Sequence, residues 1–239
     1  MSTNRILLPV LALGAVAVAL AGCAAPVSSG PVRSEERTVA ADVHEVVLAT
    51  SGNLDVVIGD EPSLTVSAPA GLLPRLTSDS SGGVLTLGSR GGPVLFGFGK
   101  VTYTLTLPLI DALELVGSGD ATADFAGAAD VDIRIDGSGD VRAVGIDADE
   151  VRVALSGSGD ASLAGAARSG DFAIDGSGDI NAANLELSSG DAQVSGSGDL
   201  RINAADRLDA SVSGSGDIRY SGSPRLASDV SGSGEITGN

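Results

Sequence analysis

The tetrapeptide Gly-Ser-Gly-Asp recurs six times in the second half of this 239-residue chain, and a seventh copy ends in Glu instead of Asp. The seven copies begin at Gly117, Gly137, Gly157, Gly176, Gly196, Gly214 and Gly232, so that successive copies start 18 to 20 residues apart. A fixed period of about 20 residues is typical of proteins whose similar units stack and bury a shared core. The repeat therefore constrains the architecture strongly and the chemistry only weakly.

Short apolar runs flank every copy of the tetrapeptide. The residues four and two positions before each turn are apolar or small: Leu113/Leu115, Ile133/Ile135, Val153/Leu155, Phe172/Ile174, Ala192/Val194, Ala210/Val212 and Ser228/Val230. Alternation with a period of two places one face of each strand toward a common interior. Stacked coils about 4.8 Å apart would pair the backbone groups of neighbouring units. We therefore predict an all-β fold, with a β-solenoid over residues 111–239; an antiparallel meander with Gly-rich hairpins is the alternative.

Residues 39–110 precede the repeats and predict a β region stacked on the solenoid. Short alternating or β-branched runs between turn residues indicate strands at Val43–Leu48, Leu54–Ile58, Leu64–Ser67, Val84–Leu87 and Val101–Leu107. No segment after the amino terminus has a sustained helical period.

The amino terminus has the features of a targeting segment. Arg5 precedes an apolar run from Ile6 to Leu20, and Leu-Ala-Gly-Cys follows immediately, ending at Cys23. This arrangement resembles the bacterial lipoprotein signal, which implies removal of residues 1–22, lipidation of Cys23 and attachment to the outer side of a cytoplasmic membrane or within the cell envelope. The alternatives are an ordinary secretory signal or an uncleaved anchor. Residues 23–38 are rich in Pro, Ser, Gly and charge, which predicts a flexible spacer.

The charge balance excludes some partners. Fourteen basic residues face 31 acidic ones, for a formal net charge of −17. A surface this acidic repels nucleic-acid phosphates and anionic lipid headgroups, so we expect neither as a ligand. A single cysteine also rules out a disulfide within the chain.

The chain is similar to the DUF2807 family, described as auto-transporter adhesins with a head GIN domain. The resemblance depends on the reiterated Gly-Ser-Gly-Asp, on the run Val-Thr-Tyr-Thr-Leu-Thr-Leu-Pro at 101–108 and on the lipoprotein signal upstream. It covers residues 43–239 and implies a β-helical domain exposed in the envelope. It implies no catalytic residues.

The acidic residues of the tetrapeptides are expected to form a column, and their carboxylates have two possible roles. Asp120, Asp140, Asp160, Asp179, Asp199 and Asp217, followed by Glu235, would lie one above another in stacked coils. Ca²⁺ could relieve the repulsion between them, since it takes carboxylate oxygens as ligands. We favour the alternative, in which each carboxylate accepts hydrogen bonds from amides of its own or the adjoining turn. We therefore expect no obligatory cofactor or metal.

The other members of the tetrapeptide are expected to be structural. Tight corners with unusual backbone angles require glycine, which concerns Gly117, Gly119, Gly137, Gly139, Gly157, Gly159, Gly176, Gly178, Gly196, Gly198, Gly214, Gly216, Gly232 and Gly234. The serines between them predict a hydroxyl ladder or a cap on the turn. A nucleophilic serine would need an activating base, and the only histidine, His44, lies outside the repeats.

Half of the four phenylalanines, Phe96 and Phe98, lie in the Gly-rich segment 91–100. Aromatic side chains on a loop can anchor a partner; the alternative is a loop that covers one end of the solenoid, since solenoids need their ends covered.

Together these features predict a non-catalytic, lipid-anchored envelope protein with an adhesin-like binding or display role, whose partner is a surface protein or a glycan. The alternative is an envelope module that binds or cleaves carbohydrate, although a β-helical lyase for acidic sugars would need basic residues that this acidic chain has in short supply.

Overall fold

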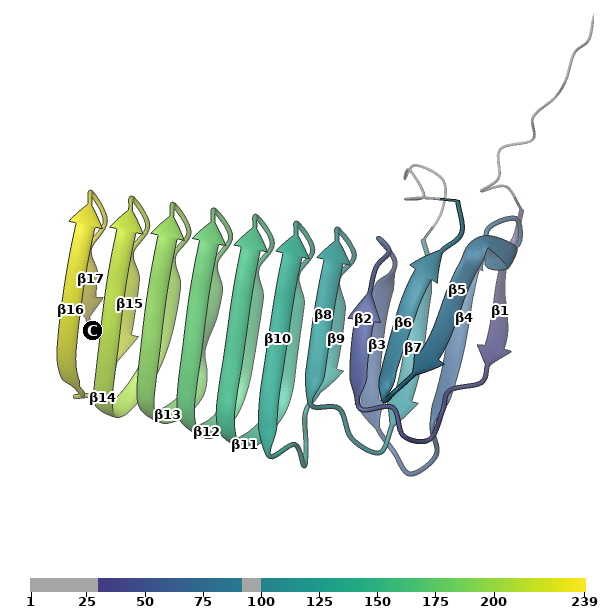
Figure 1. The fold of residues 1–239 in the computed structure, drawn as a ribbon, viewed down its shortest axis with the longest axis horizontal. Coiled ribbons are helices and arrows are strands. Elements are labelled where there is room, and N and C mark those ends of the chain that lie inside the picture. The colour runs from purple at the N-terminus through teal and green to yellow at the C-terminus, as the bar shows by residue number, and fades with distance from the viewer. Residues whose placement is uncertain (1–29, 92–99) are drawn as a thin grey trace, which may run out of the picture.

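The protein is an elongated β-solenoid in the computed structural model, which describes residues 30–91 and 100–239 (Figure 1). Strands stack side by side along the long axis, with the N-terminal strands at one end and the C-terminus at the other. The predicted fold class is confirmed, including the N-terminal β region stacked on the repeats.

Strands are the main secondary structure of the described chain. The strands are β1 (Val32–Arg37), β2 (Glu45–Leu48), β3 (Asn53–Ile58), β4 (Ser63–Pro69), β5 (Leu76–Ser81), β6 (Val84–Ser89), β7 (Thr102–Leu107), β8 (Ala112–Gly117), β9 (Ala121–Asp124), β10 (Asp130–Gly137), β11 (Val141–Gly157), β12 (Ala161–Gly176), β13 (Ile180–Gly196), β14 (Leu200–Gly214), β15 (Ile218–Ser221), β16 (Arg225–Gly232) and β17 (Ile236–Gly238). One 3-10 turn, η1 (Leu73–Arg75), lies between β4 and β5.

The coils stack in parallel, in two sheets that face each other. The first sheet contains β8, β10, the C-terminal parts of β11 to β14, and β16. The second contains β9, the N-terminal parts of β11 to β14, β15 and β17. Because every pairing among these strands is parallel, the antiparallel meander is wrong for the repeats.

The Gly-Ser-Gly-Asp corner joins the two sheets in every coil and brings backbone against backbone. The Ser138 N–H donates to the Gly117 carbonyl at 2.8 Å, and the next coils repeat this bond. A Cβ added at Gly137, where φ is +149°, would lie 2.0 Å from the Gly117 oxygen; one added at Gly139 would lie 1.9 Å from the Gly119 oxygen. Both glycines are therefore required by close approach of the neighbouring coil.

The interior consists of aliphatic rows that run along the axis. One row, at the position two residues before each corner, joins Leu115, Ile135, Leu155, Ile174, Val194 and Val212 through the strand register. Each of these side chains is at most 2% exposed. The predicted alternation is thus the inside–outside pattern of the coils.

The N-terminal end is covered. Strands β2 and β3 continue the two sheets in parallel with β8 and β9, whereas β4, β5 and β1 add antiparallel pairings beyond them. Leu72, Leu73 and Leu76, around η1, are buried at this end. The solenoid core is therefore closed on this side.

The flexible-spacer prediction for residues 23–38 is wrong for residues 32–37, which form β1. This strand pairs along β4, and the Arg37 guanidinium donates to the carbonyls of Leu76 (2.9 Å) and Leu73 (3.0 Å). An edge strand rich in charge, with almost all of its side chains exposed, has no hydrophobic alternation to reveal it.

Several predictions fall on residues 1–29 and 92–99, outside the described residues: the signal segment, lipidation at Cys23 and the partner loop with Phe96 and Phe98. Within the described ranges, no helix has the length and apolar character needed to cross a membrane.

We predict that Gly139→Ala destabilises the protein by about 3 kcal/mol or more, because the added methyl group would overlap the Gly119 carbonyl. Gly82→Asn is the matched control: Gly82 has φ +60° with no atom within 4 Å of an added Cβ, and asparagine tolerates that conformation. Denaturant titration of both variants measures the difference. Equal stability of the two variants would contradict the close-approach argument.

Candidate functional site

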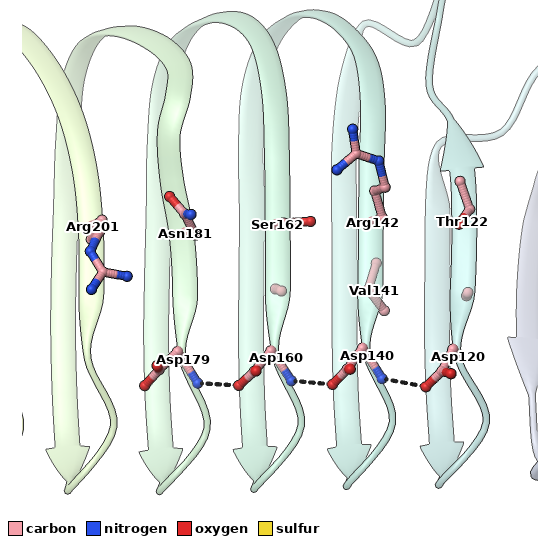
Figure 2. Close-up of a pocket in the computed structure, with 12 residues that line it drawn as sticks. Asp120, Thr122, Asp140, Val141, Arg142, Asp160, Ser162, Asp179, Asn181 and Arg201 are labelled. Carbon is pink, nitrogen blue, oxygen red and sulfur yellow. Dashed lines mark hydrogen bonds between the residues drawn. The ribbon is translucent and has the colours of Figure 1, made fainter.

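The aspartate column lies along one edge of the second sheet, as the sequence predicts (Figure 2). The Asp120 carboxylate accepts the backbone N–H of Asp140 at 3.2 Å, and Asp140 accepts that of Asp160 at 3.0 Å. The same bond continues through Asp179, Asp199, Asp217 and Glu235 at 2.8 to 3.0 Å. Each of the six aspartates thus binds the amide of the next coil, in agreement with the interpretation favoured from the sequence, and Glu235 contributes only its amide.

These hydrogen bonds leave each aspartate of the column with one carboxylate oxygen free of backbone partners. Among residues 30–91 and 100–239, no group of three or more His, Cys, Asp or Glu has an arrangement that could hold a metal ion. The expectation of no obligatory metal stays a prediction, and the stacked amides account for the aspartates without calcium.

A second polar row lies two residues beyond the column on the same strands. The register places Thr122, Arg142, Ser162, Asn181 and Arg201 side by side on adjacent coils. Together the two rows line a shallow groove of about 450 Å³ that runs along the solenoid axis. Figure 2 shows both rows on one face, with the Arg142 and Arg201 side chains three coils apart. We call this surface the Asp120–Arg201 groove.

The guanidinium groups of Arg142 and Arg201 have no hydrogen bond or ion pair among the described residues. In contrast, Arg219 in the same row pairs with Asp199 at 2.9 Å and with Asp217 at 2.8 Å. Burial raises the pKa of Asp199, but the Arg219 guanidinium, the Asp217 amide and the positive charge of Arg201 outweigh burial and hold that pKa below its usual value. The groove thus contains two guanidinium groups that make no hydrogen bond or ion pair, and the charge of Arg201 acts on Asp199.

On the outward face of the first sheet, the arginines that precede the last coil are paired. Arg134 binds Asp132 at 2.8 Å, and Arg152 binds Glu150. These exposed pairs neutralise their own charge locally and contribute little to stability. Outside the last coil, whose Arg225 also has no ion pair, the unpaired arginines therefore distinguish the groove from the opposite face.

The remaining sequence candidates lie apart from one another. The corner serines are exposed, and it is their backbone N–H groups that bind the preceding coil; within the described chain their hydroxyls make no hydrogen bond, so the expected hydroxyl ladder is absent there. His44 lies before β2 and binds Asp111 at 3.0 Å. The hydrogen bond to Asp111 and its negative charge raise the pKa of His44.

A second hollow, of about 90 Å³, lies near the N-terminal end and is lined mostly by apolar atoms, including those of Leu72, Leu76 and Val101. Ligand pockets have volumes of about 300 to 1,000 Å³. As far as the described residues define it, this hollow is too small for a ligand of that size.

The second polar row of the groove, from Thr122 to Arg201, could not be predicted from the sequence. Thr, Arg, Ser and Asn form no motif, and their alignment exists only after the coils have stacked. The available signal was their common position two residues after each acidic residue of the repeat.

The fold and the groove define a class: β-solenoids that present an extended polar face. Comparison with family models matches residues 42–224 to DUF2807, described as "Putative auto-transporter adhesin, head GIN domain". The chain belongs to this family. Comparison with curated proteins gives no match.

Solved structures share the architecture. A putative adhesin from Bacteroides fragilis NCTC 9343 is 25% identical, with a TM-score of 0.84, over 89% of this chain and 99% of that chain. A putative lipid binding protein from Parabacteroides distasonis ATCC 8503 is 21% identical, with a TM-score of 0.71, over 89% and 98%. A putative adhesin from the same strain is 24% identical, with a TM-score of 0.67, over 89% and 98%. The last two likenesses support the fold alone.

We predict that Asp160→Ala lowers the free energy of unfolding by about 1 kcal/mol, because the Asp179 amide loses its acceptor. Asp160→Asn keeps an acceptor oxygen and removes one charge from the column, so we expect its stability to stay within about 0.5 kcal/mol of the wild type. Denaturant titration compares them. If Asn destabilises as much as Ala, the column depends on charge and not on the hydrogen bond.

Proposed function

We propose that this chain is a lipid-anchored envelope protein that binds a surface partner along the Asp120–Arg201 groove without catalysing a reaction. The observation that carries the proposal is that Arg142 and Arg201 make no ion pair in a groove that also contains the polar side chains of the aspartate column and of the second row. The adhesin descriptions of the family and of the similar structure from Bacteroides fragilis agree with a binding role.

The polar side chains of the groove supply groups that can bind a ligand. Guanidinium groups form charge-assisted hydrogen bonds with carboxylates and other oxygens, and the free carboxylate oxygens of Asp120, Asp140 and Asp160 can accept hydrogen bonds from hydroxyl or amide groups. The lining includes no histidine or cysteine. Such a set of groups suits binding better than acid–base chemistry at neutral pH.

A carbohydrate is the second candidate ligand, and the spacing of the groove favours it. The groove repeats its acidic side chain once per coil, about every 4.8 Å, so a polymer that repeats its hydroxyl groups would meet an equivalent acceptor at each step. A protein partner has no need of such periodicity.

Attachment to the membrane through Cys23 predicts a clear biochemical phenotype. We expect Cys23→Ser to abolish incorporation of labelled fatty acid and to shift the protein from the membrane to the soluble fraction, because two acyl chains are what hold such a protein on a bilayer. Ser28→Ala is the control and should behave as the wild type. A membrane-bound but unlabelled wild type would instead indicate an uncleaved anchor, and a soluble one an ordinary secretory signal.

Binding is tested with the full chain immobilised and probed with a panel of purified cell-surface polysaccharides and with envelope fragments. We expect the double variant Arg142→Ala/Arg201→Ala to lose affinity by about tenfold or more, since each lost charged hydrogen bond costs about 1.5 to 3 kcal/mol. The control is Arg134→Ala/Arg152→Ala, which removes the same charge from the opposite face.

Equal losses in the two double variants would reject the groove as the contact surface. Binding to polysaccharides would identify a carbohydrate ligand, and binding to envelope fragments that survives removal of their glycans would identify a protein. Turnover of any probe would reject the non-catalytic role.

A further inference from the structure

The last described coil, formed by β15, β16 and β17, lacks the cover that every other coil has. Val230 follows the register of Val212 and Leu226 that of Leu208. The buried pair Leu208 and Val212 is at most 2% exposed, whereas Leu226 is 39% and Val230 is 45% exposed. Side chains that belong to the interior are therefore exposed at this end of the solenoid, and no described residue covers them.

The backbone of β16 is also unpaired on its outer side. Ala227 has the same register position in its coil as Asp132 has in the first repeat. The Asp132 N–H donates to the Asp111 carbonyl of the preceding coil at 2.8 Å. Ala227 therefore directs its backbone groups toward the preceding coil. Because successive residues of a strand point their backbone groups in opposite directions, Leu226, Ser228 and Val230 direct their N–H and C=O groups outward. An edge of this kind is a template for another strand.

We propose that the β16 edge pairs with the β16 edge of a second copy of this chain, antiparallel about a two-fold axis at Ser228. In this register Leu226 lies opposite the second copy's Val230, Val230 opposite its Leu226, and Ser228 opposite its own equivalent. The inward side chains that are exposed in one copy then cover each other, and the three outward-directed residues each form a hydrogen-bonded pair. The symmetric contact is closed, so it stops at two copies.

Charge complementarity supports the same register. Arg225 and Asp229 have no ion pair among the described residues. In the antiparallel pair Arg225 lies diagonally across from Asp229 of the second copy, within the reach of a long side chain. The two-fold axis produces this opposite-charge pair twice.

The opposite end of the solenoid does not fit this edge. Strand β1 has the sequence Val-Arg-Ser-Glu-Glu-Arg and β5 the sequence Leu-Thr-Ser-Asp-Ser-Ser, so head-to-tail stacking would place Leu226 and Val230 against polar and charged edges. Charged edge strands resist pairing. The structure therefore favours a closed dimer over an open filament.

The experiment measures the mass of the purified full chain by sedimentation at about 1 to 300 µM, a range chosen because one coil end is a small contact. The chain carries Cys23→Ser, so that no acyl group contributes to association. We expect a monomer–dimer equilibrium in which Val230→Lys weakens the dimer by about tenfold or more. Val57→Lys is the control, since Val57 is 47% exposed on another coil, and it should leave the dimer unchanged.

The register is tested separately by exchanging the charges. Arg225→Asp and Asp229→Arg should each weaken the dimer, and the double variant should restore it. A monomer at all concentrations, polymers that grow with concentration, equal effects of Val230→Lys and Val57→Lys, or a double variant weaker than both single ones would each overturn the proposal.

Discussion

The close approach of backbone to backbone at the Gly-Ser-Gly-Asp corners is the constraint on which the rest of the solenoid depends. The Ser138 amide reaches the Gly117 carbonyl at 2.8 Å only because neither glycine of the corner has a Cβ. Each coil is thereby held in register with its neighbour at one fixed point. The aliphatic rows inside and the polar rows outside follow from that register. Successive side chains of a strand point to opposite faces, so fixing one residue of the strand fixes the face of every other.

This constraint separates the residues that build the fold from those that can carry a function. The corners and the inward rows repeat because each coil must fit the one before it. The outward row of the groove is under no such requirement, and its members change from Thr122 to Arg142, Ser162, Asn181 and Arg201 along the axis. Asp120, Asp140, Asp160 and Asp179 combine both roles: one carboxylate oxygen binds the adjoining coil, and the side chain lines the groove. We infer that specificity for a partner lies in the residues that do not repeat.

The parts of the structure that could be predicted from the sequence are those with a local signature. The period of the tetrapeptide, the alternation before each turn and the glycines together predict a solenoid and identify its interior, because all three depend on near neighbours in the chain. Strands β1 and β5 were missed because strands with few buried residues lack alternation. The groove could not be predicted for another reason: Arg142 and Arg201 are 59 positions apart, and only the stacked register brings them onto one face. Likewise, the sequence could not show that the corner serines use their backbone amides and not their hydroxyls.

The two ends of the solenoid differ in a way that relates the fold to binding. The N-terminal end is closed by Leu72, Leu73 and antiparallel strands, whereas β16 ends the sheet with exposed apolar side chains. In the proposed dimer the two-fold axis is normal to the sheets, so the second sheets of both copies face the same side. Because the two β16 strands are antiparallel, the Gly-Ser-Gly-Asp corners and the grooves of the two copies lie at opposite strand ends of that common side, and the N-terminal strands lie at the two outer ends. A partner with repeated binding groups could engage both grooves at once, which raises avidity without any new contact within either groove.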